Sequence, residues 1–238
     1  MVSLMSKEIT VIIPTFNEET NIMSCLQAIF NKNIQLIDEV IIADNYSQDK
    51  TVQLSKQFDV CIVTGGYPAV ARNNGAKTAR GKYLLFIDAD TFIPEDFLKN
   101  AISAFKRKNL KIASFYIRPY PADKFNILLF GFYNKLSFIL AKYSLPIIAT
   151  AGCCLLVEKK IHDHINGFRE NMLVLEEYDY IKRIKKYGKF RVIPIPITTS
   201  TRRFLPGMRL KRTVILILYY VKWLVTGSIN NDKLGYWK

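Results

Sequence analysis

Short apolar runs alternate with amphipathic segments through the first half of the chain. Runs rich in β-branched residues predict strands, and apolar residues at helical spacing, such as Ile22, Leu26 and Ile29, predict helices. The predicted strands span residues 8–14, 38–44, 60–65 and 82–90. The predicted helices span residues 18–30, 47–58, 67–79 and 94–108. Such alternation predicts an α/β fold in which a mostly parallel, Rossmann-like sheet is covered by helices on both faces.

The second half of the chain is less regular. Residues 125–145 form a long apolar segment interrupted by Lys135 and Lys142. The remaining segments predict a buried strand over 146–158, a helix over 176–188, an extended stretch over 189–204, and a basic turn followed by an apolar helix over 209–226. We therefore expect one domain over residues 1–208 and a separate basic and apolar C-terminal segment over 209–238.

Two carboxylates directly follow the fourth predicted strand, in the segment LLFIDADTF. Asp90 could simply cap the helix that starts near Pro94, or Asp88 and Asp90 together could hold a metal ion. The carboxyl ends of parallel strands meet at one rim of a sheet, which is where open α/β folds bind ligands. Because Thr15 follows the first strand and Asp44 the second, these side chains should converge with the acid pair. That convergence favours the metal site.

Paired carboxylates are hard oxygen ligands, which suit Mg²⁺ or Mn²⁺. A protein that offers only two of them usually lets substrate phosphates complete the coordination shell. The acid pair therefore suggests a metal-bound nucleotide. The segment IPTFNEE stands where a glycine-rich dinucleotide fingerprint would follow the first strand, and no P-loop motif occurs. Dehydrogenases and P-loop enzymes are disfavoured on that ground.

The chain of 238 residues carries a net charge of +14, which points to a polyanionic partner. Nucleic acid is not expected, because no recognition motif is visible. The four cysteines form no Cys-x-x-Cys pair, which makes zinc improbable and favours buried free thiols in a reducing compartment. The short apolar start before Lys7 does not fit a signal peptide, so we expect a cytoplasmic catalytic face.

Five segments, VIIPTFNEE, IIADNYSQDKT, ARNNGAKTARGKYLLFIDAD, INGFRENMLVLEEYDYIKRIKKYG and TTSTRRF, occur in one order over roughly residues 9–204. Together they resemble the family 2 glycosyltransferases with the GT-A fold. The resemblance implies an inverting enzyme that moves a sugar from a metal-bound nucleoside-diphosphate sugar, a UDP- or GDP-sugar, to an acceptor glycan or a lipid-linked acceptor. It implies a nucleotide-binding half over about 7–117 and an acceptor half over about 118–208.

The resemblance also implies roles for individual residues on the donor side. The nucleotide cleft would be lined by Pro14, Thr15 and Glu18, and Asp44 would hydrogen-bond the base. Arg72 would lie near the nucleotide. Asp88 would face the ribose and the metal, and Asp90 would bind the Mn²⁺ or Mg²⁺. Arginine forks match phosphate geometry, so Arg202 and Arg203 either bind the diphosphate or merely extend a basic face.

Glu177 occupies the position at which the family usually has the aspartate base of a Glu-Asp pair. The pair here is Glu-Glu, a departure that moves the carboxylate by one methylene and keeps Glu176 and Asp179 as candidate bases. Asp179 and Arg183 have the spacing of a surface ion pair on a helix. His162 and His164 fall outside the matched motifs, and we expect them in a solvated loop.

The apolar segment over 213–226 is short for a membrane span, which needs about 20 apolar residues. Basic residues precede it directly, a pattern typical of a helix lying in the interface of an anionic leaflet. Residues 125–145 could do the same. We therefore expect a peripheral protein at the inner face of the cell membrane, although packing against the sheet or in a dimer would explain both segments.

Two other functions fit this sequence. A nucleotidyltransferase can share the sheet and the acid pair, and would release pyrophosphate. A catalytically degenerate membrane-binding protein on the same fold would show neither donor hydrolysis nor metal dependence. The oligomeric state, the sugar and the acceptor are left open by the residues.

Overall fold

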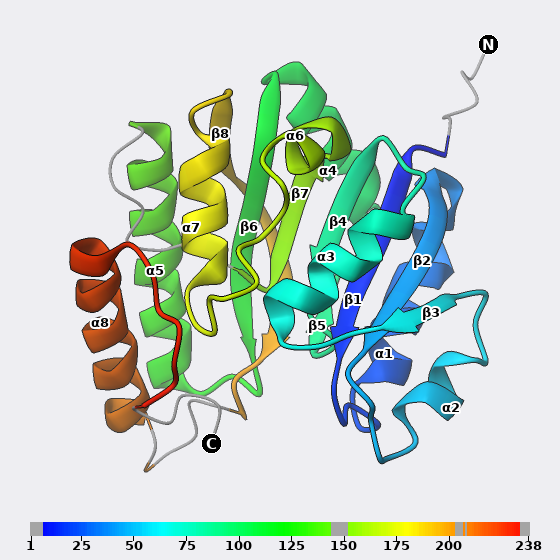
Figure 1. Cartoon of the computed structure of the whole chain (residues 1–238), viewed down its shortest axis with the longest axis horizontal. Helices are drawn as coiled ribbons and strands as arrows, with labels where there is room; N and C mark the ends of the chain where they lie inside the picture. Colours follow the sequence, from blue (N-terminus) through cyan, green and yellow to red (C-terminus); the bar gives the residue numbers. More distant parts are fainter. Residues whose placement is uncertain (1–6, 144–151, 203–206, 208, 234–238) are drawn as a thin grey trace.

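A single sheet of eight strands runs through the centre of the molecule, in the order β3-β2-β1-β4-β7-β6-β8-β5. The structure is a computed structural model, and it describes residues 7–143, 152–202, 207 and 209–233. Helices cover both faces of the sheet (Figure 1). The predicted α/β fold with a mostly parallel sheet is confirmed.

The first four strands pair in parallel and form the regular half of the sheet. Their bounds are β1 (Ile9–Thr15), β2 (Ile37–Asp44), β3 (Cys61–Thr64) and β4 (Tyr83–Ile87). The connecting helices are α1 (Ile22–Lys32), the 3₁₀ turn η1 (Ile34–Leu36), α2 (Thr51–Ser55) and α3 (Pro68–Thr78). Helix α2 is much shorter than the predicted 47–58.

The remaining strands are β5 (Thr91–Phe92), β6 (Leu110–Tyr120), β7 (Cys154–Glu158) and β8 (Lys189–Ser200). Two of them, β7 and β5, run antiparallel to the rest of the sheet. Strand β7 runs antiparallel to both β4 and β6, while β6 and β8 are parallel. The pattern of the sequence did not predict β6, and the strand expected over 146–158 is seen only from Cys154, since residues 144–151 lie outside the described part of the chain.

The two longest helices of the described residues, α5 and α8, lie in the second half of the chain. The helices after β5 are α4 (Phe97–Arg107), α5 (Lys124–Lys142), α6 (Lys159–His164), α7 (Glu176–Ile184) and α8 (Arg209–Thr226). Helix α5 includes most of the apolar segment over 125–145, for which no element was predicted. Helix α8 includes the apolar segment over 213–226. None of the helices in the described residues combines the length and the apolar character needed to cross a membrane.

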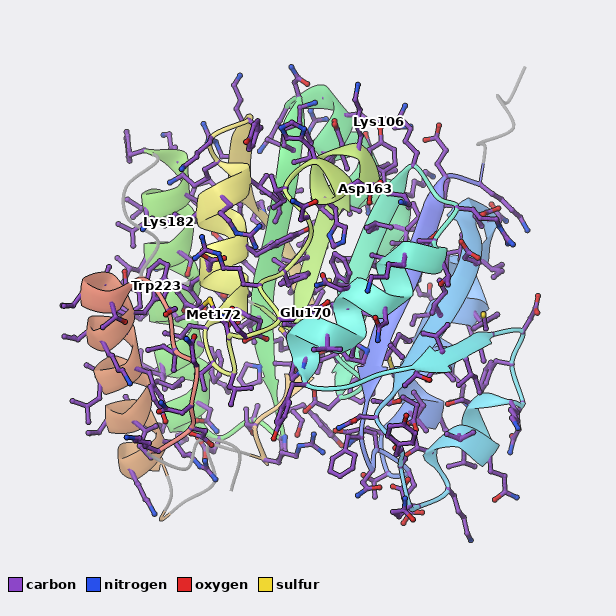
Figure 2. The ribbon with its side chains drawn as sticks, in the orientation of Figure 1. Lys106, Asp163, Glu170, Met172, Lys182 and Trp223 are labelled. Carbon is purple, nitrogen blue, oxygen red and sulfur yellow. The ribbon has the colours of Figure 1, made fainter. Side chains whose placement is uncertain are left out.

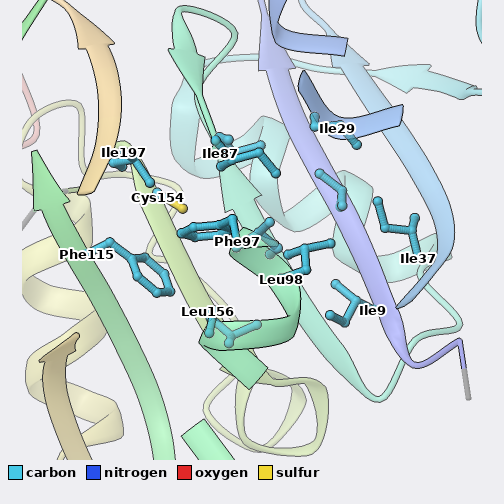
Figure 3. Packing of buried hydrophobic residues seen from close by; sticks show 14 of the residues in the cluster. Ile9, Ile29, Ile37, Ile87, Phe97, Leu98, Phe115, Cys154, Leu156 and Ile197 are labelled. Atoms are coloured by element: carbon cyan, nitrogen blue, oxygen red, sulfur yellow. The ribbon is translucent and has the colours of Figure 1, made fainter. Parts of the chain in front are cut away.

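Two hydrophobic clusters sandwich the sheet, one on each face. On one face α1 and α4 bury Ile22, Leu26, Phe97 and Phe105 against the strands; Figure 3 shows part of this cluster, including Phe97 beside Leu98. Burying one such side chain stabilises the fold by about 1.5–3 kcal/mol. The spacing that predicted α1 therefore identified its buried face correctly.

The opposite face is covered by α3, α6 and α7, including Tyr180 of α7, and by Phe168 from the segment between α6 and α7. His162 donates to or accepts from the Tyr180 hydroxyl at 2.7 Å through Nδ1, and burial lowers the pKa of His162 to about 4. The expectation of a solvated loop for His162 and His164 is wrong, because both lie on α6 and His162 is buried. A third, smaller cluster holds α8 against the segment before α7.

Candidate functional site

The ends of β1 and β2 meet at the carboxyl rim of the sheet. Asp44 accepts a hydrogen bond from the Thr15 hydroxyl at 2.7 Å, and both side chains are nearly buried. Ser47 donates to the same carboxylate twice, from its backbone N–H at 2.9 Å and from its hydroxyl at 2.6 Å. Pro14 precedes Thr15 in β1 and is partly exposed. These bonds hold the Asp44 carboxylate in one orientation.

Asp88 and Asp90 lie in the turn that follows β4. The Asp88 backbone N–H donates to the carbonyl of Cys153 at 2.9 Å, and its own carbonyl accepts from Thr91 at 3.0 Å. The Asp90 carbonyl accepts from the Ser200 N–H at 3.1 Å. Elements from three parts of the chain therefore fix the turn. Helix α4 begins at Phe97 with Asp96 as its N-cap, so the alternative in which Asp90 caps this helix is wrong.

Arg202 reaches the acid pair from the end of β8. Its Nη1 donates to Glu18 Oε2 at 3.0 Å, its Nη2 contacts Glu18 Oε1, and the same Nη2 lies 3.4 Å from Asp90 Oδ2. The hydrogen bonds to Glu18 raise the pKa of Arg202. Because Thr199 of β8 pairs with Thr91 of β5, the strand delivers this guanidinium beside the turn that carries Asp90. Arg203 lies outside the described residues.

Arg72, on α3, joins the acid pair to helix α7. Its Nη2 donates to Asp88 Oδ1 at 3.0 Å, and its Nη1 donates to Glu176 Oε1 at 2.7 Å. The guanidinium also lies over the ring of Phe168, 5.4 Å from its centroid. Burial alone would lower the pKa of Arg72, but the carboxylates of Asp88, Glu176 and Glu177 outweigh burial and raise it. This arginine stays charged.

Glu177 lies on the first turn of α7, and its side chain fills the space that a Cβ at position 152 would need. A Cβ at position 152 would come within 2.7 Å of Glu177 Cγ and 2.8 Å of Cδ, so a larger residue there would displace the glutamate. Although part of the Glu177 surface reaches solvent, burial raises its pKa to about 8, and the neighbouring Glu176 carboxylate adds to the rise. Arg72 opposes this shift without cancelling it.

The two other candidate bases are already engaged. Glu176 is buried and bound to Arg72. Asp179 is also buried, and it pairs with Arg183 at 2.7 Å and with Arg169 at 3.2 Å, so the expectation of a surface pair is wrong. Both carboxylates are thus already occupied by contacts with arginines. Glu177 is the member of this acidic turn with a raised pKa.

The acid pair fits a divalent cation of the kind that binds substrate phosphates. In the part of the chain that the structure describes, no three His, Cys, Asp or Glu side chains come close enough to hold a metal ion by themselves. Asp88 and Asp90 are partly exposed, with 36% and 16% of their side chains accessible. Two accessible carboxylates with no third protein ligand suit Mg²⁺ or Mn²⁺ that takes its other ligands from a diphosphate.

Several residues at this rim were not assigned to the site from the sequence. Ser47 is the clearest, and its place three residues after an aspartate in an Asn- and Ser-rich turn could have indicated it. Gly152 and Cys153 gave no comparable signal, because glycines and cysteines are common in buried strands. Cys153 is partly buried beside Thr91, while the expectation of buried thiols is wrong for Cys61, which is exposed.

Sequence comparison connects the chain with one family. The family described as "Glycosyl transferase family 2" matches residues 10–165, which includes the strand ends and the acid pair but ends before Glu177 and Arg202. A poly(ribitol-phosphate) β-glucosyltransferase of Bacillus spizizenii is 32% identical over 101 residues, covering 38% of this chain and 16% of that protein. The "Dolichyl N-acetyl-alpha-D-glucosaminyl phosphate 3-beta-D-2,3-diacetamido-2,3-dideoxy-beta-D-glucuronosyltransferase" of Methanococcus voltae is 35% identical over 109 residues, covering 42% and 34%. The chain thus spans about a third or less of these relatives.

Solved structures share the fold. The mannosyltransferase PcManGT of Pyrobaculum calidifontis, in complex with GDP-Man and Mn²⁺, superposes with a TM-score of 0.70 at 21% identity, over 96% of this chain and 67% of that one. TarS of S. aureus, in complex with UDP-GlcNAc, gives a TM-score of 0.67 at 14% identity, over 96% and 69%. Since the family match spans more than half of the residues, this chain belongs to glycosyl transferase family 2.

Proposed function

We propose that this protein is an inverting glycosyltransferase that moves a sugar from a UDP- or GDP-sugar to a hydroxyl of an acceptor glycan or lipid-linked acceptor. One observation carries the proposal: Arg72 binds Asp88 and Glu176 together. This contact holds the acid pair, which suits a metal-bound diphosphate, beside the first turn of α7. That turn carries Glu177, whose pKa is raised. A donor site and a proton acceptor are thereby adjacent.

The Asp44 carboxylate supports binding of the nucleotide base. Its Oδ1 accepts from Thr15 and from the Ser47 hydroxyl, and its Oδ2 accepts one backbone N–H. A carboxylate oxygen has two lone pairs, so Oδ2 retains a position for one further donor. The Watson–Crick edges of uracil and guanine both offer an N–H to such an acceptor. Pro14 and Thr15 would border this part of the cleft.

In this proposal Asp88 and Asp90 hold Mn²⁺ or Mg²⁺, as hard oxygen ligands would. The bound cation supplies Lewis-acid stabilisation of the negative charge that develops on the departing diphosphate. Support for a divalent metal comes from the two carboxylates and from the Mn²⁺ in the related mannosyltransferase structure. Arg202 already lies against Asp90 and Glu18, and its guanidinium fork matches the geometry of a phosphate.

Glu177 is the proposed general base. An acceptor hydroxyl must lose its proton as its oxygen attacks the anomeric carbon, and a carboxylate within reach of that hydroxyl can take it. Once ionised, a Glu177 carboxylate with a pKa near 8 is a stronger proton acceptor than an ordinary glutamate. Attack from the face opposite the departing diphosphate inverts the anomeric centre.

The acceptor is inferred from the chemistry that the relatives' names contain. One relative is named for poly(ribitol-phosphate) and another for a dolichyl-linked N-acetylglucosaminyl phosphate. Both names describe anionic acceptors, which is compatible with the net charge of +14 here. The proposal includes a location at the inner face of the cell membrane, where a lipid-linked acceptor would be available.

A donor screen tests this function. Thermal shift of the chain with UDP, GDP, UDP-sugars and GDP-sugars, each with and without Mn²⁺, should show metal-dependent stabilisation by one nucleotide class. Incubation with that donor should then release nucleoside diphosphate. Release of pyrophosphate would instead identify a nucleotidyltransferase, and absence of any metal-dependent binding would favour a degenerate transferase fold.

A further inference from the structure

Helix α8 presents two apolar faces, and only one of them is covered. Ile215, Tyr219 and Trp223 pack against the segment before α7. The opposite face consists of apolar side chains that are 44–82% exposed, at the spacing of one helical stripe. They are Val214, Ile217, Leu218, Val221, Leu224 and Val225. A soluble surface rarely carries a continuous stripe of this kind without a partner.

Helix α5 presents a second stripe. Leu128, Phe132 and Ile139 are 75%, 66% and 49% exposed, and their spacing puts them on one side of the helix. The same spacing puts the exposed Lys135 and Lys142 on that side. The opposite side buries Ser137 and Ala141.

The two helices lie at the same end of the molecule, at the end of its long axis opposite β3 (Figure 1). Helix α7 connects them: the Tyr178 hydroxyl forms a hydrogen bond with Tyr133 of α5, and its ring meets Trp223 of α8 at 6.1 Å between centroids. Figure 2 shows Trp223 of α8 and Lys182 of α7 at this end, and the Lys182 ammonium lies 5.2 Å from the Trp223 ring.

The sequences of α5 and α8 contain lysine and arginine but no aspartate or glutamate. Lys211 and Lys222 border the exposed stripe of α8. Apolar side chains flanked by basic ones are suited to an anionic bilayer, because the apolar groups enter the acyl boundary while lysines reach the phosphates. A second copy of this chain would instead bring two basic surfaces together, at a cost in repulsion.

We propose that the exposed stripes of α5 and α8, together called the α5–α8 face, dock the protein onto the surface of an anionic lipid bilayer. The helices lie in the interface and do not cross it. The proposal does not depend on sugar transfer. It does imply that Glu177, which precedes Tyr178 on α7, faces acceptors presented close to the bilayer surface.

Flotation with lipid vesicles tests this docking without any substrate. The full chain should bind vesicles of equimolar phosphatidylcholine and phosphatidylglycerol, and bind vesicles of phosphatidylcholine alone much more weakly. Raising the salt concentration should release only part of the bound protein, because salt screens the charges but not the apolar contacts.

Two variants locate the surface. Leu218→Ser, Val221→Ser and Val225→Ser together should weaken binding to the mixed vesicles by roughly 10- to 100-fold, since they remove apolar contacts from exposed positions. Ile34→Ser, at an exposed apolar position on another part of the chain, is the matched control and should bind normally. Lys135→Gln with Lys222→Gln should weaken binding by roughly 10- to 30-fold. Lys56→Gln with Lys108→Gln changes the net charge equally and should have little effect.

Because the substituted side chains are exposed, an unchanged melting temperature should accompany the loss of binding. Equal binding by the triple-serine variant and the intact chain would overturn the proposal, as would an equal loss in both lysine pairs. Sedimentation provides a further test. If the intact chain is a dimer and the triple-serine variant a monomer, a second copy covers this face and the proposal is overturned.

Discussion

Arg72 and Glu176 form a buried ion pair, with 2.7 Å between Nη1 and Oε1, although 104 positions separate them in the sequence. The pair crosses from α3, which belongs to the regular half of the sheet, to α7 in the second half. Its arginine also holds Asp88. This single buried guanidinium therefore links the acid pair directly to the helix turn that carries Glu177.

Replacing Arg72 by leucine should destabilise the fold by about 3–5 kcal/mol, because two carboxylates would remain without their partner. Urea unfolding measures the loss. Arg80→Leu is the matched control: this arginine also contacts two carboxylates, but its side chain is 70% exposed. The control should cost about 1 kcal/mol or less. Equal losses in the two variants would contradict the structural role given to Arg72.

Asp90→Asn should abolish Mn²⁺-dependent binding of nucleoside diphosphate, since it removes the charge of one carboxylate of the acid pair. Calorimetric titration with and without Mn²⁺ measures this directly, and a chelator should reproduce the defect in the unmodified chain. Asp96→Asn, at the exposed N-cap of α4, should bind normally. Normal metal-dependent binding by Asp90→Asn would contradict the assignment of the metal site to this turn.

Glu177→Gln should lower sugar transfer by about 10²–10⁴-fold, the usual contribution of a general base, while donor binding persists. Glu177→Asp restores the usual family residue but shortens the side chain, so it should be only partly active. Near-normal transfer by Glu177→Gln would point to another base or to an acceptor oxygen that is already ionised. The pH profile separates these outcomes, because only another base preserves an acidic limb.

The same residue should give a pH-dependent stability. The pKa of Glu177 rises from an ordinary value of 4.5 to about 8 in the folded chain, so ionisation is less favourable there than in the unfolded chain. Below about pH 4.5, Glu177 does not alter the free energy of unfolding. As the pH rises from there toward 8, its ionisation lowers the free energy of unfolding, and above pH 8 its contribution stays constant. Glu177→Gln should therefore melt increasingly higher than the unmodified protein across that window. A difference in melting temperature independent of pH would contradict the raised pKa.

Gly152→Ala should reduce transfer far more than stability. The added methyl group would lie within 3 Å of the Glu177 side chain, which must then move. Gly131→Ala is the control, because a Cβ at position 131 meets nothing within 4 Å. Steady-state kinetics on both variants, with thermal melts, test the prediction. Full activity in Gly152→Ala would show that Glu177 need not keep its observed position.

The sequence predicted the regular half of the fold well, because each of its elements has a local signal. The spacing of Ile22, Leu26 and Ile29 marks the buried face of α1, and β-branched runs mark the parallel strands. Strand β6 has no such signal, since its long mixed segment is buried at Leu110 and Ile112 but exposed at Arg118 and Tyr120. Strand direction leaves no mark on periodicity, so the antiparallel course of β7 was not predictable.

The candidate site was predictable to a similar extent. Thr15 and Asp44 end their strands and Asp88 and Asp90 follow theirs, and topology alone brings such residues to one rim. Pairings between distant side chains have no local signature. The burial of Asp179 between two arginines and the contact of Gly152 with Glu177 required the folded chain to be known.

The antiparallel pairing of β4 with β7 has a consequence for biosynthesis. Strand β4 reads YLLFI and is buried along its whole length, yet its partner on one side, Cys154–Glu158, leaves the ribosome some seventy residues later. Until then a growing chain exposes an unpaired, strongly apolar strand edge, the kind of surface that pairs with other chains. A fragment that ends before β7 is thus expected to aggregate, and the family match, which runs to residue 165, extends just past the strand that closes this edge.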